Sequence, residues 1–286
     1  MTVTPGVMPG GGPGLLGDTR ARTYADKLRL FNAFAAPELV HALTLLDVHP
    51  GDAVLDAGCG TGEACATLRD STGPSGLVVG IDLSDAHAHI AARTTRTGQA
   101  ILVADATTLP FAPRSFDRLW CSNTINHVRQ PVRTLTHMAR VLKPEGVIAL
   151  GQSAFLPDMM FSWDARLEQE VTSACRQYYR DKYGLDERDL AATRNLIGIL
   201  TRAGLAVDSV QTLVIERTQP LSPADEAYFL ECVFHGYWGE RLRPYLTDTD
   251  WQTLAASCDP AGLDYCLRRP DFHHLQTYTV VIGKLL

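Results

Sequence analysis

The chain has 286 residues, of which 45% are hydrophobic and 20% are charged, so it can bury the core of one large α/β domain and is neither fibrous nor wholly disordered. Its formal net charge of −6, with no long run of Lys or Arg, argues against nucleic acid as a partner. Its seven cysteines include no C-x-x-C pair, which argues against a disulfide framework or a zinc site and predicts a reducing, cytoplasmic compartment.

The N-terminal region is predicted to be a disordered tail followed by two helices. Residues 1–18 are rich in Gly and Pro and contain neither a basic leader nor an apolar segment. A helix is predicted to start near Ala21, with Tyr24 and Leu28 on its apolar side, and a second helix to cover Pro37 to Leu46. No apolar stretch of 18 or more residues occurs later in the chain, so no membrane-spanning helix is expected.

From Ala53 onward, short β-rich runs alternate with helical ones. Strands are predicted at 53–57, 77–82, 100–104, 116–121 and 145–151, and helices between them at 62–70, 84–96 and 130–142. This alternation is typical of a doubly wound, mostly parallel α/β sheet with right-handed crossovers. The strands are nearly continuous apolar runs, which indicates that helices cover both faces of the sheet.

After Gln152 the alternation is interrupted twice. An insertion rich in aromatic residues and Met precedes a helix at 191–203 and a strand at 207–217, and a second helical insertion precedes the final β-rich run, 275–285. We therefore expect a tail (1–18), a core (19–151), a helical lid insertion (152–187), more core (188–217), a second helical insertion (218–270) and a last core strand (271–286).

A glycine-rich segment, Asp56-Ala57-Gly58-Cys59-Gly60-Thr61-Gly62-Glu63, connects a predicted strand to a predicted helix. Glycines at such a turn let the backbone approach a ligand closely, although glycine-rich turns also occur where nothing binds. A dinucleotide-binding G-x-G-x-x-G loop would need Gly at position 63, where this chain has Glu63. The spacing therefore disfavours pyrophosphate on this helix.

Acidic residues end three of the predicted strands. Asp82 ends the second strand, 20 residues beyond Gly62, where a carboxylate can accept hydrogen bonds from both ribose hydroxyls. Asp105 follows the third strand, where it can accept from an adenine amino group, and Asp56 ends the first. Each Asp alone has the alternative of capping a helix or a turn. Three acids at the same edge of the sheet make coincidence less likely than a ligand site.

Together with further segments, these residues resemble the ordered motif series of class I S-adenosylmethionine (SAM)-dependent methyltransferases. The matching segments are Val54 to Gly62, Val78 to Asp82, Asp105 with Leu109-Pro110-Phe111, Ser115-Phe116-Asp117, and Val141 to Gly146. They are most similar to the branch that includes ubiquinone and menaquinone biosynthesis enzymes and many natural-product tailoring enzymes. The resemblance covers roughly residues 20–151, is weaker for 188–217 and 272–286, and is absent from the insertions.

The resemblance implies a Rossmann-like methyltransferase fold: a seven-stranded, mostly parallel sheet with helical lid insertions, whose last strand runs antiparallel between its neighbours. It implies SAM as cofactor and S-adenosylhomocysteine (SAH) as product. Carried over by position, the residues that would line the methionyl and ribose parts of SAM are Asp56, Gly58, Cys59, Gly60 and Gly62.

The same resemblance implies further cofactor contacts. Asp82 would hold the ribose and Leu83 would pack on the adenine, with Asp105 and Ala106 at the adenine edge. At the end of the fourth strand, the backbone that would meet the amino acid part of SAM belongs to Ser122 and Asn123. Tyr24 would contact the methionyl end, with packing on the apolar side of its helix as the alternative.

Methyl transfer from a sulfonium is an in-line displacement, so the protein must align the reactants, exclude water and, where needed, remove a proton. His127 directly follows the fourth strand and is the first candidate base, although it could also only cap or pack a short helix. Glu170, in the aromatic first insertion, is the second candidate. Weaker candidates are His235, His273 and His274, and no spacing of acids with them suggests metal ligands.

The predicted function is SAM-dependent methylation of a small apolar, aromatic or isoprenoid metabolite, as in secondary metabolism. The sequence leaves open whether oxygen, nitrogen or carbon is methylated, and whether the chain forms a homo-oligomer. One alternative is a SAM-binding cyclase or isomerase that does not methylate. A second alternative, an NAD-dependent oxidoreductase, is disfavoured by Glu63.

Overall fold

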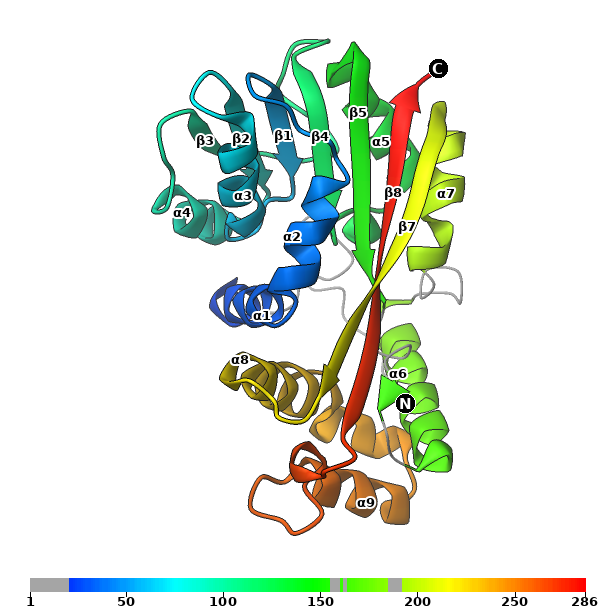
Figure 1. Cartoon of the computed structure of the whole chain (residues 1–286). Coiled ribbons are helices and arrows are strands. Elements are labelled where there is room, and N and C mark those ends of the chain that lie inside the picture. The colour runs from blue at the N-terminus through cyan, green and yellow to red at the C-terminus, as the bar shows by residue number, and fades with distance from the viewer. Residues whose placement is uncertain (1–20, 155–159, 162–163, 185–191) are drawn as a thin grey trace.

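The computed structural model describes residues 21–154, 160–161, 164–184 and 192–286. Within them, an α/β sheet half and a smaller group of helices are joined by two long strands (Figure 1). The predicted tail, residues 1–18, and part of the first predicted insertion lie outside the described residues. Among the described helices, none combines the length and the apolar character needed to cross a bilayer.

The central sheet is mostly parallel. Its strands are β1 (Ala53–Ala57), β2 (Leu77–Asp82), β3 (Gln99–Val103), β4 (Phe116–Ser122), β5 (Leu142–Ser153), β6 (Met160–Phe161), β7 (Leu205–Thr218) and β8 (His273–Leu285). The order is β3-β2-β1-β4-β5-β8, and both β7 and the short β6 pair with β8. Strand β8 is antiparallel to β5 and to β7. The predicted seven-stranded Rossmann-like sheet with an antiparallel last strand is confirmed, and β6 extends it by two residues.

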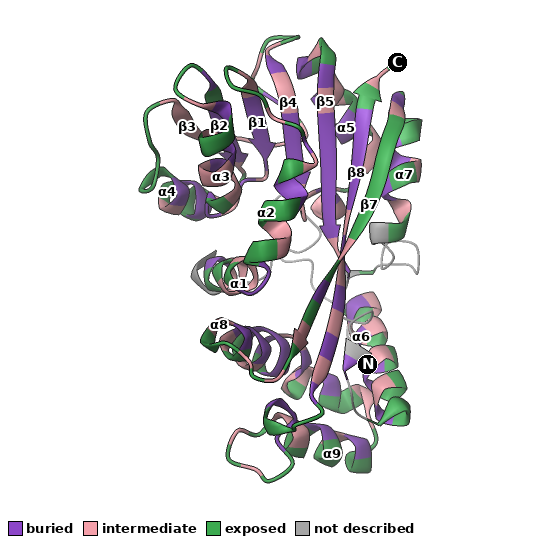
Figure 2. Ribbon diagram, in the orientation of Figure 1, coloured by how far each residue is buried: buried purple, intermediate pink, exposed green. Residues whose placement is uncertain are grey.

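Helices cover both faces of the sheet. Successive residues of a strand point to opposite sides, so neighbouring residues of β1 pack against helices on different faces. The helices of the sheet half are α1 (Ala21–Phe34), α2 (Ala36–Thr44), α3 (Glu63–Thr72), α4 (Asp85–Ala92), α5 (Pro131–Val141) and α7 (Ala192–Arg202). Val54 packs in one core with Leu43 of α2 and Leu68 of α3. The next residue, Leu55, packs in a second core with Leu135 of α5. The central strands are accordingly buried along most of their length (Figure 2).

Strands β7 and β8 form a ribbon that is longer than the rest of the sheet. They pair from Leu205 with Leu285 to Thr218 with His273, whereas β5 pairs with β8 only as far as Tyr278. The free part of this ribbon carries a helical lobe (Figure 1). We define the helical lobe as α6 (Ala165–Tyr183), α8 (Pro223–Ala227), the π-helix η4 (Tyr228–Trp238), η5 (Glu240–Tyr245), α9 (Asp248–Cys258) and η6 (Cys266–Arg268).

The two predicted insertions meet in this lobe although they are far apart in the sequence. Arg166 of α6 donates to Asp250 of α9 at 2.7 Å, and the Tyr245 hydroxyl of η5 donates to Asp181 of α6 at 3.0 Å. The lobe also shares a core with α1, because the ring of Phe34 stacks on that of Tyr228, with centroids 4.1 Å apart. The helix over the sheet edge and the lobe are therefore packed as one unit.

One predicted helix is shorter in the structure. Helix α4 ends at Ala92, whereas the sequence pattern predicts helix over 84–96. Thr94 and Thr95 turn their hydroxyls back onto the carbonyls of Ala91 and Ala92, at 3.0 and 2.9 Å. Such side-chain bonds compete with the helical ladder, which explains the early end.

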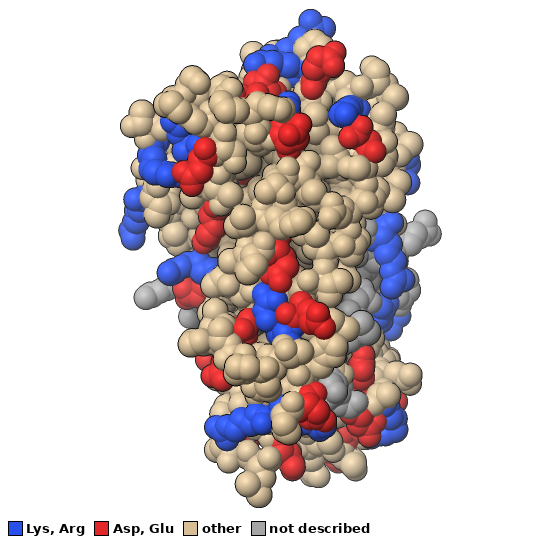
Figure 3. Space-filling view, viewed as in Figure 1, with Lys and Arg blue, Asp and Glu red and all other residues tan. Residues whose placement is uncertain are grey.

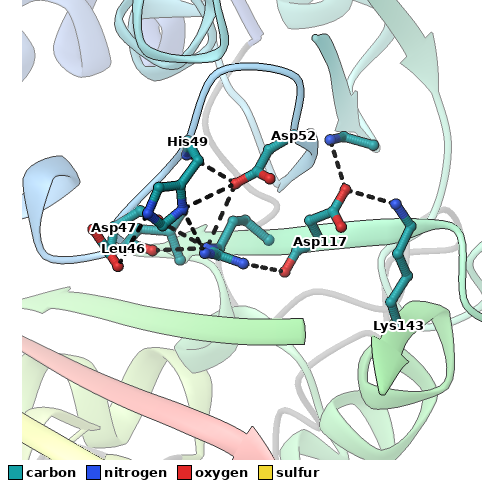
Figure 4. Close-up of polar contacts among 8 residues, drawn as sticks. Leu46, Asp47, His49, Asp52, Asp117 and Lys143 are labelled. Atoms are coloured by element: carbon teal, nitrogen blue, oxygen red, sulfur yellow. Dashed lines mark hydrogen bonds and ion pairs between the residues drawn. The ribbon is translucent and has the colours of Figure 1, made fainter. Parts of the chain in front are cut away.

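Two segments of the motif series, Ser115-Phe116-Asp117 and Val141 to Gly146, lie at the amino ends of β4 and β5. This edge of the sheet is opposite the glycine loop. Asp117 of β4 accepts from Lys143 of β5 at 2.7 Å and from the Ala53 amide of β1 at 2.9 Å (Figure 4). Arg118 donates to the carbonyl of Asp47 at 3.0 Å and lies 3.7 Å from Asp52. These contacts hold β1, β4 and β5 in register, so this part of the motif series has a structural role.

The charged side chains of the sheet half are mixed in sign. On the face shown in Figure 3, Lys and Arg lie among Asp and Glu without forming a broad basic area over the strands. This distribution agrees with the net charge of −6.

Arg217 of β7 ties α1 and α2 to the lobe. Its guanidinium donates to Glu38 of α2 at 2.8 and 3.1 Å, to Asp225 of α8 at 2.9 Å and to the carbonyl of Phe34. It also lies over the Phe34 ring, 4.7 Å from the centroid. The Arg217 side chain is only 15% exposed, so both carboxylates depend on it for charge compensation.

Arg217→Met is expected to lower the free energy of unfolding by about 3 kcal/mol, because it leaves two partly buried carboxylates without a cation. The matched control is Arg269→Met, which breaks an exposed pair with Asp271 and should cost less than about 1 kcal/mol. Urea denaturation of both variants measures the difference. Equal losses in the two variants would contradict the tying role of Arg217.

Candidate active site

A cavity of about 1150 Å³ lies at the carboxyl ends of β1, β2, β3 and β4, and α1 covers it. Most predicted cofactor residues line it: Tyr24, Asp56, Gly58, Cys59, Gly60, Asp82, Leu83, Asp105, Ala106, Ser122 and Asn123. The candidate base His127 also lines it. Gly62 and Glu170 are not among its lining residues. The predicted residues thus come together from five separate stretches of the chain.

The glycine loop is confined from two sides. Gly58 and Gly60 have φ values of +85° and +54°, which favour glycine. A Cβ on Gly58 would come within 2.1 Å of Thr124 Oγ1 in the turn after β4. A Cβ on Gly60 would come within 3.3 Å of Leu28 in α1. Position 58 therefore has no room for a side chain, position 60 has little, and both α1 and the β4 turn lie directly against the loop.

Gly62 has a different reason to be glycine. Its φ is +91°, and a Cβ would come within 2.9 Å of the Cβ of Ala91 in α4. Its absence from the cavity wall is explained by this close packing of the loop against α4. The prediction that Gly62 contacts the cofactor remains a prediction.

Asp82 is held by the backbone and faces the cavity. Its Oδ2 accepts from the Gly60 amide at 2.9 Å and its Oδ1 from the Ser84 amide at 2.8 Å. Asp105 accepts from the Thr107 amide at 2.7 Å, so the turn-capping alternative is realised in a residue that also lines the cavity.

Asp56 is almost fully buried at the end of β1. Burial raises its pKa to about 7, an effect that the Cys65 thiol opposes by donating at 3.3 Å to Oδ2 and that Asp82 and Glu63 reinforce through their negative charges. A buried acid that titrates near neutrality is costly to ionise without a cation nearby. The cavity therefore favours a positively charged group beside β1.

The turn after β4 is strained and strongly held. Asn123 has φ +48°, in the left-handed region that Asn tolerates better than most residues. Its Oδ1 accepts from the Ser153 amide at 2.8 Å, the Ser153 hydroxyl at 2.9 Å and Gln152 at 3.0 Å. The side chain of Asn123 thus fixes the turn to β5. Sequence reasoning missed this role, because no local pattern links residues 123 and 153.

His127 sits in the short helix η1 (Ile125–His127) that follows this turn. Its Nδ1 is buried and has no hydrogen-bond partner among the described residues. Burial lowers the pKa of His127 to about 4, against smaller opposing effects of the Asn123 backbone and Asp82. The imidazole is therefore neutral across the physiological range, with an unshared nitrogen beside the cavity.

The other candidate bases lie elsewhere. Glu170 is exposed on α6, and His235 is exposed on η4. His273 pairs with Glu216 at 2.7 Å, and His274 is buried among the rings of Phe161 and Phe229 without a hydrogen-bond partner for either ring nitrogen in the described structure. None of these residues lines the cavity. The described residues also contain no cluster of His, Cys, Asp and Glu that could hold a metal ion.

One end of the cavity is apolar, which sequence reasoning did not foresee. Leu39, Val40 and Leu43 of α2 line it opposite Ala64 and Thr67 of α3. The total volume exceeds the roughly 300–1,000 Å³ of a typical single-ligand pocket. The cavity therefore has room for a cofactor and a second small molecule. The apolar residues of α2 were a usable signal, but only their packing partner α3 shows that they border a cavity.

The sequence matches known proteins over this region. The profile of a family described as a methyltransferase domain matches residues 55–150. The methyltransferase GfsG of Streptomyces halstedii is 30% identical over 184 residues, covering 63% of this chain and 61% of that protein. An uncharacterized 37.1 kDa protein in transposon TN4556 of Streptomyces fradiae is 33% identical over 194 residues, covering 66% of this chain and 53% of that protein. The chain thus spans between about half and three fifths of these two relatives.

Solved structures agree on the fold. The 4+2 cyclase SpnF has a TM-score of 0.53 and 17% sequence identity, and the similarity covers 93% of this chain and 95% of that one. At this identity the likeness concerns the fold alone.

The raised pKa of the buried Asp56 predicts that the free energy of unfolding depends on pH. Its pKa is raised from 3.8 to about 7 in the folded protein, so its stabilising contribution is fully present below pH 3.8 and is lost as the pH rises through 7. Without ligand, Asp56→Asn should become more stable than the unsubstituted protein as the pH rises from 5 to 8, by up to a few kcal/mol. Urea denaturation at both pH values measures this. The exposed Asp70→Asn is the control, and the same pH dependence in both variants would contradict the prediction.

Proposed function

Because the chain belongs to the class I SAM-dependent methyltransferases, for which SAM is the cofactor, we propose that it transfers the methyl group of SAM to a small molecule. The observation that carries this proposal is the single cavity lined by the glycine loop and by Asp56, Asp82 and Asp105. These acids match the needs of a cationic amino acid, a ribose and an adenine, respectively.

The cavity wall supports a specific arrangement of the cofactor. Asp82 would accept the ribose hydroxyls, and Leu83, whose side chain is 52% exposed, offers an apolar surface to the adenine beside Asp105 and Ala106. Asp56 would face the positively charged methionyl part, whose charge would favour the ionised acid. The remaining proposed contacts to the methionyl and ribose parts of SAM come from Tyr24, Gly58, Cys59, Gly60, Gly62, Ser122 and Asn123.

In the proposed reaction, a lone pair of the acceptor attacks the methyl carbon in line with the carbon–sulfur bond. That bond breaks, its electron pair stays on sulfur, and SAH is formed. Where the acceptor loses a proton, Nδ1 of His127 takes it in the tautomer whose proton is on Nε2, a role supported by the neutral state of the ring, its location in the cavity wall and the lack of a hydrogen-bond partner for Nδ1 among the described residues. The chain's other contribution is alignment and exclusion of water.

The acceptor that fits best is a small apolar, aromatic or isoprenoid metabolite, as in natural-product or quinone pathways. The apolar end of the cavity between α2 and α3 and the relative named as the methyltransferase GfsG support this class. Glu170 remains an alternative base for methylation at carbon, although its exposure on α6 favours His127. All seven cysteines are free thiols, in line with the predicted reducing, cytoplasmic location.

A SAM-binding cyclase on the same scaffold is the weaker alternative. The similarity to SpnF concerns only the fold, whereas the more similar GfsG is named a methyltransferase. We therefore favour methyl transfer.

Cofactor binding is tested by thermal shift. SAM or SAH at about 100 times its Kd should add about 2.7 kcal/mol of stability and raise Tm by about 5 °C or more, whereas NAD should not. A shift with NAD alone would overturn the cofactor assignment. Transfer of a tritiated methyl group to a panel of phenols, quinols and isoprenoids then separates methylation from mere SAM retention.

The proposed base is tested with the acceptor that this panel identifies. His127→Ala should lower kcat by about 10²- to 10⁴-fold while the Kd for SAH stays unchanged. With SAM saturating, so that Asp56 is already ionised, the kcat/KM for the acceptor should fall below about pH 4 to 5, because His127 titrates near 4. Glu170→Gln is the paired variant and should retain turnover. Full activity in His127→Ala would reject the base, and loss of activity in Glu170→Gln would transfer the role to Glu170.

A further inference from the structure

His87 is a buried polar residue of the cavity wall to which the proposed reaction assigns no role. Its side chain is 6% exposed and lines the cavity. It belongs to the first turn of α4, which Ser84 caps by accepting from the His87 amide at 3.3 Å. The cap and the short helix fix where the imidazole lies.

The imidazole lies against the proposed ribose acid. Its Nδ1 is 3.3 Å from Oδ1 of Asp82. The contact attracts when Nδ1 carries a proton, whereas a neutral ring protonated only at Nε2 would place a lone pair against the carboxylate, so Asp82 favours the tautomer with the proton on Nδ1. With the amides of Gly60 and Ser84, it is the third polar group around Asp82 and the only one of them on a side chain. His87 therefore adds a side-chain contact to the two amides that orient the carboxylate.

The second ring nitrogen lacks a partner. Nε2 of His87 is buried and makes no hydrogen bond to any described residue. When Nδ1 carries the proton beside Asp82, Nε2 is an acceptor, and a buried acceptor without a donor costs free energy. A hydroxyl brought next to Asp82 is a donor of the kind that this nitrogen lacks.

The face of the same ring contacts helix α1 through Tyr24. Tyr24 stacks on His87 with ring centroids 5.6 Å apart and an angle of 21° between the planes. One turn further along α1, Leu28 lies against Gly60, which itself donates to Asp82. The side chain of His87 thus contacts both Tyr24 of α1 and the carboxylate of Asp82.

We propose that His87 is a positioning residue that couples recognition of the cofactor's ribose to the docking of α1. Its Nδ1 side holds Asp82 toward the ribose hydroxyls, and its ring face holds Tyr24. Because both contacts use one rigid ring, ribose binding and α1 docking each favour the other. This inference rests on the proposed function, since the ligand is the adenosyl cofactor.

Two substitutions separate the two sides of the ring. His87→Phe keeps a stacking face for Tyr24 and removes both nitrogens, whereas His87→Asn keeps an N–H near the position of Nδ1 and removes the face. The ligands are SAH and its 2′,3′-dideoxy analogue, and calorimetry gives their Kd values. His87→Phe should weaken SAH by about tenfold and leave the dideoxy analogue unchanged. In His87→Asn, the ratio of the two Kd values should stay near that of the unsubstituted protein.

Hydrogen exchange of α1 provides the reciprocal readout. SAH should increase amide protection across Ala21–Phe34 in the unsubstituted protein and in His87→Phe, but much less in His87→Asn. His89→Asn, at an exposed residue of α4 that does not line the cavity, is the matched control and should behave as the unsubstituted protein in this measurement. Thermal melting without ligand confirms that each variant is folded.

The outcomes distinguish this inference from the proposed function. If the unsubstituted protein does not bind SAH, the proposed function fails. If it binds SAH but His87→Phe weakens SAH and the dideoxy analogue equally, or neither, His87 does not act through the ribose and the inference is overturned. Equal protection of α1 in His87→Phe and His87→Asn would likewise overturn the coupling.

Discussion

The close approach of the turn after β1 to the turn after β4 is the constraint on which the cavity depends. The Thr124 side chain packs so closely on Gly58 that a Cβ at position 58 would clash with it. The β4 turn cannot yield, because Asn123 holds it in a left-handed conformation with hydrogen bonds to β5. The cofactor loop and the short helix with His127 are therefore placed by one contact. A change on either turn reaches both the binding and the chemical part of the site.

The helical lobe is joined to this site through α1. Phe34 at the end of α1 packs in the lobe core, while Tyr24 and Leu28 near its start lie against the cavity. Arg217 adds charge compensation between the same elements. One helix therefore belongs to both the lobe core and the cavity wall. The two insertions thus meet in one lobe, which their separate positions in the sequence do not suggest.

The parallel sheet and the glycine loop could be predicted because their signals are local: continuous apolar strands, positive-φ glycines and acids at strand ends. What failed or was missed depends on contacts between distant segments. The hydroxyl of Thr94 helps to end a helix that periodicity extends, and Asn123 bridges to β5. The stacking of Tyr24 on His87 joins residues from two helices. The π-helix η4 has more residues per turn than an α-helix, so a search for a 3.6-residue period does not detect it. The domain boundaries, the cofactor contacts and the base remain predictions.

The β7–β8 ribbon determines how far the helical lobe stands from the sheet. Beyond the last pairing of β5, at Ser153 with Tyr278, the ribbon continues to the pairing of Thr218 with His273, and only the two residues of β6 pair with it there among the described residues. Each residue pair in this stretch sets about 3.3 Å of separation, and removing a single pair would also turn every side chain to the opposite face. Removing two pairs would bring the lobe about 7 Å closer and keep all faces in place. The length of the ribbon can therefore change only in steps of two residues if the lobe is to keep the same face toward the sheet half.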